Sequence, residues 1–487
     1  MATRRQISAH STVWAHCALL QLSPTFCSHT QHLPCTQPLG MSLLALIDSA
    51  YLVELALLAS GIVLLALGAA PVAVGVALIL AWLVFTPLLL FLVVRCCQAR
   101  SKAEHSLDAC AAALRANSTF SALISQPLHG LEPSSLQIVT SSSMMLHAPG
   151  CQRCHPFDLS RAGRLLQQLR STTPVQCHSP VNAVLDVRTG AASMQAGRVA
   201  ALATSIGVAS AVEVPLIAPL PSLLLYGMLT RPSLAAAAGS VTGMGLALRA
   251  AQLGKTAGLA AQACAPSTVV SVSGGYHHAS YSTAHGFCMI PDVTLALAAA
   301  RAALGDDARI AVVDLDVHCG DGHLLDAGSL PNVFIYDACR TDIFPADPQA
   351  LSAADRCRPL RAGMGAAEYL RTISDLPAWF QHVQPAAVVY VAGTDILDGD
   401  PLGGLQVSAR AVAARDALVW ACTRPVTATD VRWTAEEEQA GVPAAWTTAG
   451  SRYIPMLQLP AGGYQFTCAE AIAESLARCH RLFVAGE

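Results

Sequence analysis

The sequence predicts an α/β protein with a central parallel sheet covered by helices on both faces, preceded by an N-terminal transmembrane helical hairpin. Three observations predict this class. In the second half of the chain, short apolar β-branched runs alternate with alanine-rich stretches of helical length. Four of those runs end in glycine or acid followed by polar, reactive side chains. Near the N-terminus, two long apolar runs approach the roughly 20 residues that span a bilayer.

Composition sets the outer limits. The 487 residues are 53% hydrophobic and only 13% charged, which is more apolar than an ordinary soluble protein and indicates membrane segments. The net charge is -3, and Lys102 and Lys255 are the only lysines, so no basic groove is expected and direct nucleic-acid binding is not predicted. The 17 cysteines have no regular spacing, which fits a reducing compartment better than a disulfide framework.

The first forty residues, 1–40, are rich in Ser, Thr, His and Cys and are expected to be disordered. They contain Arg4 and Arg5, and no acidic residue precedes Asp48. The same bias occurs in organelle transit peptides, so a chloroplast location is an alternative for this chain.

A transmembrane hairpin is predicted within residues 41–97. Its two apolar runs, 51–67 and 72–94, are separated by a short turn without charge. Arginines before the first run and after the second place both ends on the cytosolic side, so the remainder of the chain should be membrane-anchored and face the cytosol. A buried helical pair or an error in the gene model is the alternative, and it would leave a nuclear or cytoplasmic protein.

Residues 98–135 are polar and mixed, without clear periodicity, and are expected to form a linker. Beyond them, apolar runs and helical stretches alternate. The strand candidates are 269–272, 309–313, 386–392 and 454–459; the clearest helix candidates are 159–169, 234–253, 293–304 and 366–380. The small residues of 239–245 are interpreted as allowing close helix packing.

The segment 314–323 directly follows the strand candidate 309–313 and carries unusual chemistry for a buried position. Asp314, Asp316 and His318 alternate, so they point to one side while the chain stays extended. Carboxylate oxygens beside an imidazole nitrogen make a plausible divalent-metal site. Taken alone, the segment could equally be a polar loop after a strand.

Three further strand candidates end in the same way. They lead through glycine to His277 and His278, to Asp395, and to Tyr464. In an open parallel sheet, ligands bind beyond the carboxyl ends of the strands, so these groups should meet at one rim. Two acids and a histidine can hold Zn²⁺ with an open coordination position, while a histidine pair and a tyrosine remain for proton transfer and oxyanion stabilisation. The pattern predicts a zinc hydrolase.

These residues resemble a known family, the zinc-dependent histone deacetylases, and most closely class IV. The resemblance runs from about residue 138 to the C-terminus and is carried by four motifs. They are Gly274-Gly275-Tyr276-His277-His278, Asp314-Leu315-Asp316-Val317-His318, Ala392-Gly393-Thr394-Asp395 and Gly462-Gly463-Tyr464. The resemblance implies the arginase/deacetylase fold for a catalytic domain at 136–487, in which 422–451 is expected to be an insertion.

The resemblance also implies roles for individual residues. Asp316, His318 and Asp395 would ligate zinc. Of the histidine pair, His278 would act as general base and acid with Asp321 orienting it, and His277 would pair with Asp314. Tyr464 would stabilise the oxyanion. Gly286, Phe287 and Phe344 match the walls of the family's substrate channel.

The chain departs from the class IV pattern at several places. Residues 280–285 replace the glycine-rich approach that usually precedes Gly286, and Asp321 stands where class IV members often have asparagine. The stretch 190–214 is unusually plain for the family.

The expected activity is hydrolysis of N-ε-acyl-lysine amides in proteins, histones among them, by a zinc-dependent lysine deacetylase. Two alternatives stay open at this point. One is an amidohydrolase of the same fold that acts on small acylated amines, and the other is a membrane-anchored interaction protein without activity.

Overall fold

The computed structural model describes residues 106–125, 131–132, 134–145, 158, 160–181, 208, 211–212, 226–256, 268–328, 330–424, 438 and 453–485. The predicted N-terminal segment, the transmembrane hairpin at 41–97 and nearly all of the proposed insertion at 422–451 lie outside these residues, as does most of 190–214.

A single eight-stranded sheet forms the centre of the described part of the chain, and every strand pair in it is parallel. The strand order is β2-β1-β3-β8-β7-β4-β5-β6. The bounds are β1 Leu136–Val139, β2 Val175–His178, β3 Thr268–Ser271, β4 Ile310–Asp314, β5 Val333–Arg340, β6 Arg356–Leu360, β7 Ala387–Val391 and β8 Met456–Leu459. The parallel α/β sheet predicted from the sequence is therefore confirmed.

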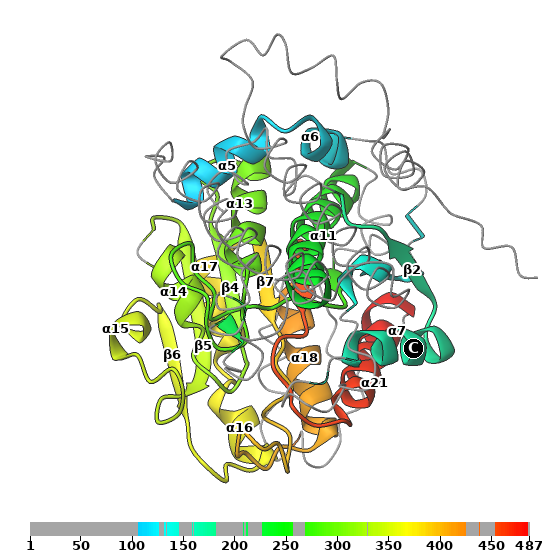
Figure 1. Cartoon of the computed structure of the whole chain (residues 1–487). Helices are drawn as coiled ribbons and strands as arrows, with labels where there is room; N and C mark the ends of the chain where they lie inside the picture. The colour runs from blue at the N-terminus through cyan, green and yellow to red at the C-terminus, as the bar shows by residue number, and fades with distance from the viewer. Residues whose placement is uncertain are drawn as a thin grey trace, which may run out of the picture.

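Helices cover both faces of the sheet (Figure 1). Side chains of α5 Leu107–Arg115, α6 Ser118–Ser125, α11 Arg231–Thr256, α13 Asp292–Leu304 and α14 Asp321–Ala327 belong to the hydrophobic core on one face. Those of α7 Arg161–Thr172, α16 Ala366–Thr372, α17 Leu376–Val383, α18 Ala409–Cys422 and α21 Cys468–His480 belong to the core on the other. Short elements complete the order: η1 Ser142–Met144, η3 Tyr226–Thr230, α15 Pro348–Leu351 and η5 Arg481–Ala485.

The central strands β4 and β7 are almost wholly apolar because both of their faces are buried. In β4, Val312 belongs to the first core and its neighbour Val313 to the second, and both are fully buried. Successive side chains of a strand point to opposite faces, so a strand covered on both sides needs an unbroken apolar run. That requirement explains why uninterrupted apolar runs in the sequence predicted these strands.

Helix α11 lies directly on the sheet because it carries small residues where it crosses its neighbours. A Cβ added at Gly243 would come within 2.6 Å of Leu457 in β8, and one at Gly245 within 2.6 Å of Leu123 in α6. The interpretation of 239–245 as a close-packing stretch is confirmed. Residues 228–251 are long and apolar enough to cross a membrane by length and composition, but they are buried inside the domain as its central helix.

Part of the predicted linker is folded, so the linker prediction is wrong for residues 107–125. Helix α5 begins at Ser106, whose side chain accepts a hydrogen bond from the amide of Ala109 at 3.2 Å. Leu107 and Leu114 of α5 and Phe120 of α6 are fully buried against the core. Polar residues at the caps and on the outer side of these two short helices concealed their apolar faces in the sequence.

The helix predicted over 366–380 is two helices. Helix α16 ends at Thr372, and α17 starts at Leu376 with Pro377 in its first turn. A proline has no amide hydrogen to donate inside a helix, but at the first turn none is needed. Pro377 therefore marks a new helix start instead of lying within one long helix.

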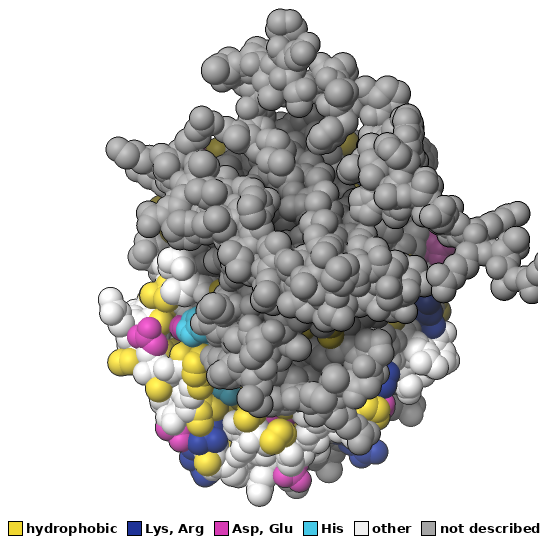
Figure 2. Space-filling view, in the orientation of Figure 1, with side chains coloured by type: hydrophobic (Ala, Val, Ile, Leu, Met, Phe, Trp, Pro, Cys, Tyr) yellow, Lys and Arg dark blue, Asp and Glu magenta, His cyan; other side chains and the backbone are white. Residues whose placement is uncertain are grey.

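The visible described surface mixes charges of both signs. Along the lower edge of the face in Figure 2, Arg side chains alternate with Asp and Glu and with hydrophobic ones. Neither sign of charge gathers into one patch among the described residues of this face.

Candidate active site

The predicted site residues come from the ends of four strands that are neighbours in the sheet, β3, β8, β7 and β4. His277 and His278 follow β3, and Asp395 follows β7. The segment from Asp314 to Asp321 joins β4 to α14, while Tyr464 follows β8. Because the four strands are parallel and adjacent, their carboxyl ends deliver all these groups to one edge of the sheet.

Asp316, His318 and Asp395 form a compact buried group. One ligand atom from each lies within 4.8 Å of the other two, and the side chains are at most 7% exposed. His318 turns Nδ1 toward both carboxylates, at 2.9 Å from Oδ2 of Asp395 and 3.2 Å from Oδ1 of Asp316. These three residues are therefore close enough to bind one cation.

Glycines make room for this group. A Cβ at Gly393 would come within 2.1 Å of Oδ2 of Asp316, and one at Gly462 within 2.5 Å of both Asp316 and Asp395. The amide of Gly462 also donates to Oδ2 of Asp316 at 2.8 Å. The glycines that end β7 and β8 in the sequence are thus needed so that the backbone can approach the two carboxylates closely.

The electrostatics of the group favour a cation. Burial raises the pKa of Asp395 to about 7, and the negative charge of Asp316 adds to this effect. Burial opposes ionisation of Asp316 as well, but His277 and His318 outweigh it and hold the pKa of Asp316 well below its usual range. The pKa of His318 is raised to about 10, because the two carboxylates outweigh its burial. Two crowded carboxylates and an imidazole are a donor set that a divalent metal fits.

His277 pairs with Asp314 behind the candidate ligands. Its Nδ1 lies 3.0 Å from Oδ2 of Asp314, and its Nε2 lies 3.7 Å from Oδ1 of Asp316. Burial would lower the pKa of His277, but the charges of Asp316 and Asp314 outweigh burial and raise the pKa to about 10. His277 therefore carries positive charge toward the site.

His278 differs from its neighbour in sequence. Its Nδ1 lies 2.7 Å from Oδ1 of Asp321, and its ring centroid is 4.1 Å from that of His277. Burial and the positive charge of His277 lower the pKa of His278 to about 3. The two adjacent histidines are thereby held in different protonation states, with His277 charged and His278 neutral. A charged histidine suits electrostatic stabilisation, and a neutral one can act as a base.

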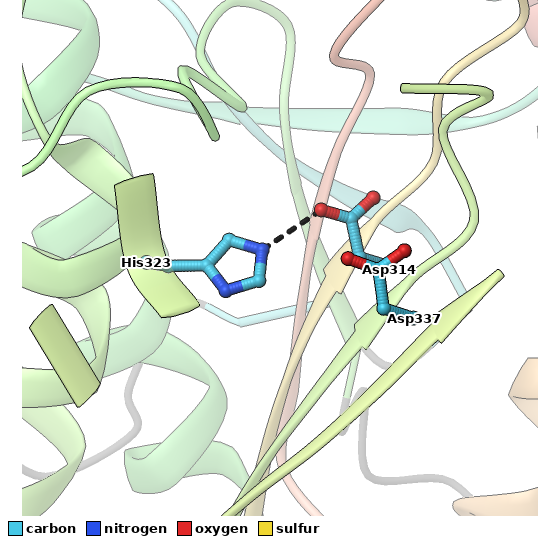
Figure 3. Close-up of side chains that lie close together, drawn as sticks. All are labelled: Asp314, His323 and Asp337. Carbon is cyan, nitrogen blue, oxygen red and sulfur yellow. Dashed lines mark hydrogen bonds and ion pairs between the residues drawn. The ribbon is translucent and has the colours of Figure 1, made fainter. Parts of the chain in front are cut away.

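A second buried group lies behind His277. Figure 3 shows His323 of α14 and Asp337 of β5 beside Asp314, and the ligand atoms of the three lie within 4.8 Å of one another, so they could also hold a cation. His323 Nε2 lies 2.8 Å from Oδ2 of Asp314. Burial and the charge of Asp314 raise the pKa of Asp337 well above its usual value. Neither His323 nor Asp337 was predicted from the sequence to belong to the site.

Tyr464 enters the site on the loop after β8. Its ring lies edge-on to His318, with centroids 6.1 Å apart. Its amide donates to Oδ2 of Asp400 at 2.9 Å. Burial and the charge of Asp395 raise the pKa of the Tyr464 phenol well above 10, so the hydroxyl keeps its hydrogen at neutral pH.

The three residues predicted to line a substrate channel lie on two sides of the site. The Phe344 ring contacts His278 edge-on at 5.0 Å, and the Phe287 ring contacts Tyr464 at 6.0 Å. Gly286 lies under the ring of His278, where a Cβ would come within 2.5 Å of that ring. Phe344 is 41% exposed, so one side of the site opens toward solvent.

Two buried arginines that hold the strand ends were missed. Arg161, at the start of α7, donates to the carbonyls of Ala461 and Gly462 in the loop that carries Tyr464. Arg415 in α18 donates to the carbonyls of Leu315 and Gly393, and so ties the end of β4 to the end of β7. Arg415 could have been found from the sequence, because it stands beside Asp416 in the middle of the otherwise apolar run 411–422, and a charged residue that is buried needs a partner.

One disulfide joins two of the site's supporting segments. Cys319, which follows His318, is bonded to Cys339 near the end of β5. No disulfide framework was predicted from the sequence; among the described cysteines this is one bonded pair, and seven others are free.

The chain is similar to several known proteins. Residues 227–433 match a family model described as the histone deacetylase domain. Histone deacetylase 2 of Arabidopsis thaliana is 29% identical over 350 residues, covering 72% of this chain and 79% of that protein. Histone deacetylase RPD3 of Saccharomyces cerevisiae is 31% identical over 155 residues, covering 28% of this chain and 34% of that protein. A crystal structure of the HDA15 HD domain aligns at 17% identity with a TM-score of 0.48, covering 72% of this chain and 89% of that chain.

The matched domain and the relatives' names identify the chain as an enzyme that hydrolyses amide bonds, a deacetylase. Within that class, the matched domain and the relatives that this chain is similar to are described as histone deacetylases. The matched stretch contains the histidine pair and the candidate metal ligands, whereas Tyr464 lies beyond its end.

Proposed function

We propose that this protein is a zinc-dependent lysine deacylase that hydrolyses N-ε-acyl-lysine amides of proteins, histones among them. The observation that carries the proposal is the buried group of Asp316, His318 and Asp395, placed next to a neutral histidine with its own carboxylate. The similarity to relatives named histone deacetylase supports the choice of substrate.

Zinc is the metal that suits the donor set. Two carboxylate oxygens and one imidazole nitrogen match the three-ligand sites in which Zn²⁺ keeps a position open for water or substrate. When bound there, zinc would polarise the amide carbonyl and acidify a water molecule.

The chain's own residues would then move the protons. His278 would accept a proton from the attacking water at Nε2, because its Nδ1 faces Asp321, and would later give that proton to the leaving amine. His277, held positive by Asp314 and Asp316, would stabilise the negative charge that develops nearby. Tyr464 would donate its hydroxyl hydrogen to the oxyanion, a role for which its raised pKa suits it.

Substrate profiling tests this proposal against the small-amine alternative. The zinc-loaded protein is given acetyl-lysine peptides, myristoyl-lysine peptides and acetylpolyamines in parallel. Turnover of either peptide above that of the polyamines is the expected result, and the ratio of the two peptides gives the acyl length that the site prefers. Turnover of acetylpolyamines alone would replace the proposal with an amidohydrolase of small acylated amines.

The finer class IV assignment is part of the proposal. Its support is a set of smaller sequence matches, among them His155-Pro156-Phe157-Asp158, Gly286-Phe287-Cys288 and Ile396-Leu397-Asp398-Gly399-Asp400.

We also propose that residues 41–97 anchor the enzyme in a membrane with the catalytic domain in the cytosol. The support is the length of the two apolar runs and the arginines that flank them. Resistance of the full chain to alkaline extraction from membranes, and loss of that resistance when 41–97 is deleted, is the expected result. A full chain released by alkali would contradict the anchor.

A further inference from the structure

A third histidine contacts the carboxylate that holds His278. Asp321 lies between two imidazoles: its Oδ1 is 2.7 Å from Nδ1 of His278, and its Oδ2 is 3.0 Å from Nε2 of His285. His278 is buried, whereas 32% of the His285 side chain is exposed. Asp321 therefore connects the proposed base to a histidine near the protein surface.

The protonation of this trio follows from Asp321. Burial would raise the pKa of Asp321, but the hydrogen bonds from His278 and His285 outweigh it and hold the pKa well below its usual value. An ionised carboxylate only accepts hydrogen bonds, so each histidine must supply the hydrogen. His278 then carries its hydrogen on Nδ1, which leaves Nε2 as the basic nitrogen.

The loop that carries His285 is anchored on the same helix as Asp321. At the start of the loop, the amide of Tyr281 donates to both oxygens of Asp326 at 2.9 Å. Asp326 lies near the end of α14, and Asp321 is the first residue of that helix. The loop thus runs along α14 from one aspartate to the other, so its position relative to Asp321 is fixed by the helix.

A tight turn aims His285 at the carboxylate. The amide of Cys288 donates to the carbonyl of His285 at 2.9 Å, and the two residues between them, Gly286 and Phe287, have φ of 56° and 64°. Positive φ at both central positions is typical of a type I′ turn. A Cβ at Gly286 would come within 2.5 Å of the His278 ring, so glycine allows the turn to lie against that ring.

We propose that His285 is a positioning residue, which anchors the second oxygen of Asp321 so that the first oxygen keeps His278 in the tautomer that hydrolysis needs. The carboxylate of an aspartate that accepts a hydrogen bond through one oxygen can still rotate broadly about χ2. A hydrogen bond to the second oxygen restricts that rotation. The proposal deepens the proposed deacylase function and rests on it for its kinetic consequence. It concerns the segment 280–285, where this chain departs from the glycine-rich pattern.

The His285 ring also lies near that of Phe344, with centroids 5.6 Å apart. The test must therefore distinguish the hydrogen bond from His285 to Asp321 from simple packing of the ring. Three variants do so. His285→Gln keeps an N–H donor where Nε2 stands but has no ring, His285→Phe keeps a ring but has no donor, and His285→Ala has neither.

Kinetics on the full-length, zinc-loaded protein with an acetyl-lysine peptide give the first readout. His285→Phe and His285→Ala should lower kcat about tenfold with little change in KM, whereas His285→Gln should stay within about twofold of wild type. A wild-type kcat in His285→Phe, or a fall in His285→Gln as large as that in His285→Phe, would overturn the proposal in favour of packing.

Nitrogen-15 NMR of the histidine rings in the same proteins gives a readout that needs no turnover. The signals of His278 are identified by their loss in His278→Asn. A single tautomer with hydrogen on Nδ1 is expected in wild type and His285→Gln, and a mixture in His285→Phe. A wild type that hydrolyses no acyl-lysine peptide would end the proposed function while the NMR still decides the role of His285; an unchanged single tautomer in His285→Phe would reject that role.

Discussion

At the scale of single residues, neighbouring titratable groups in the site have very different pKa values. The carboxylates of Asp316 and Asp395 lie close together and are both buried. The pKa of Asp395 rises to about 7 because burial and the charge of Asp316 disfavour a second negative charge. A divalent cation at this position would relieve both effects. Beside it, His277 and His278 stand next to each other in the chain and are held in opposite protonation states.

Tyr464 gives the first prediction at this scale. Tyr464→Phe removes only the hydroxyl, so metal binding should be unchanged while kcat for an acetyl-lysine peptide falls about 10²–10³-fold, as for the loss of one oxyanion donor. Zinc content and steady-state kinetics check this. A variant with normal kcat would show that Tyr464 does not stabilise the transition state.

At the scale of elements, buried charged side chains hold the strand ends in place. Arg415, a residue of α18, is fully buried and donates to backbone carbonyls at the ends of β4 and β7. Its Nε also donates to Asp416 at 2.9 Å. The spacing of the candidate ligands on these two strands depends on that link.

Arg415→Leu should therefore destabilise the protein by about 3–5 kcal/mol, because it removes the positive charge beside the buried Asp416 and the donor to two buried carbonyls. Urea unfolding measures the change. Arg410→Leu is the matched control, since Arg410 is on the same helix but exposed, and it should change the free energy of unfolding by less than about 0.5 kcal/mol. Equal effects of the two substitutions would contradict the structural role of Arg415.

The sheet edge gives a pH prediction. Burial and the nearby Arg249 lower the pKa of His178 in β2 below 6.5, and its Nε2 lies 2.7 Å from Oε1 of Gln137 in β1. The unfolded chain then binds a proton near pH 6.5 that the folded protein does not, so stability falls as the pH drops below that value. Between pH 7 and pH 5 the free energy of unfolding of wild type should fall more than that of His178→Gln. Parallel curves would show that His178 does not contribute.

At the scale of the whole molecule, the sequence was sufficient for the class of sheet, for four of its eight strands and for the convergence of the site. Uniform apolar runs marked β3, β4, β7 and β8, and the rule that ligands bind at the carboxyl ends of parallel strands placed their terminal residues together. The sequence did not reveal that these four strands are neighbours, because strand order is decided by long-range pairing that leaves no local pattern.

The parts that escaped prediction depend on contacts between distant residues. Arg161 and Gly462 are 301 positions apart in the sequence, and no pattern around Arg161 predicts that it donates to the carbonyl of Gly462. His285 looked like a break in a glycine-rich motif, and only the folded loop brings it to Asp321. The linker at 107–125 was misjudged because two short helices bury one face each.

Metal binding should also stabilise the whole domain. A ligand that binds only the folded state at 1,000 times its Kd adds about 4 kcal/mol, so zinc should raise Tm and a chelator should lower it. Differential scanning calorimetry with and without zinc checks this. No shift in wild type would mean that zinc does not bind the folded protein, and the same shift in Asp316→Ala would mean that the ion binds elsewhere.

The central claim is tested most directly by measuring bound zinc and acetyl-lysine turnover together in wild type, Asp395→Ala and Asp398→Ala. Asp398 is an exposed acid three residues from Asp395 and serves as the matched control. The account predicts that wild type and Asp398→Ala bind zinc and hydrolyse the peptide, and that Asp395→Ala loses both. Zinc binding and turnover that survive in Asp395→Ala would contradict it.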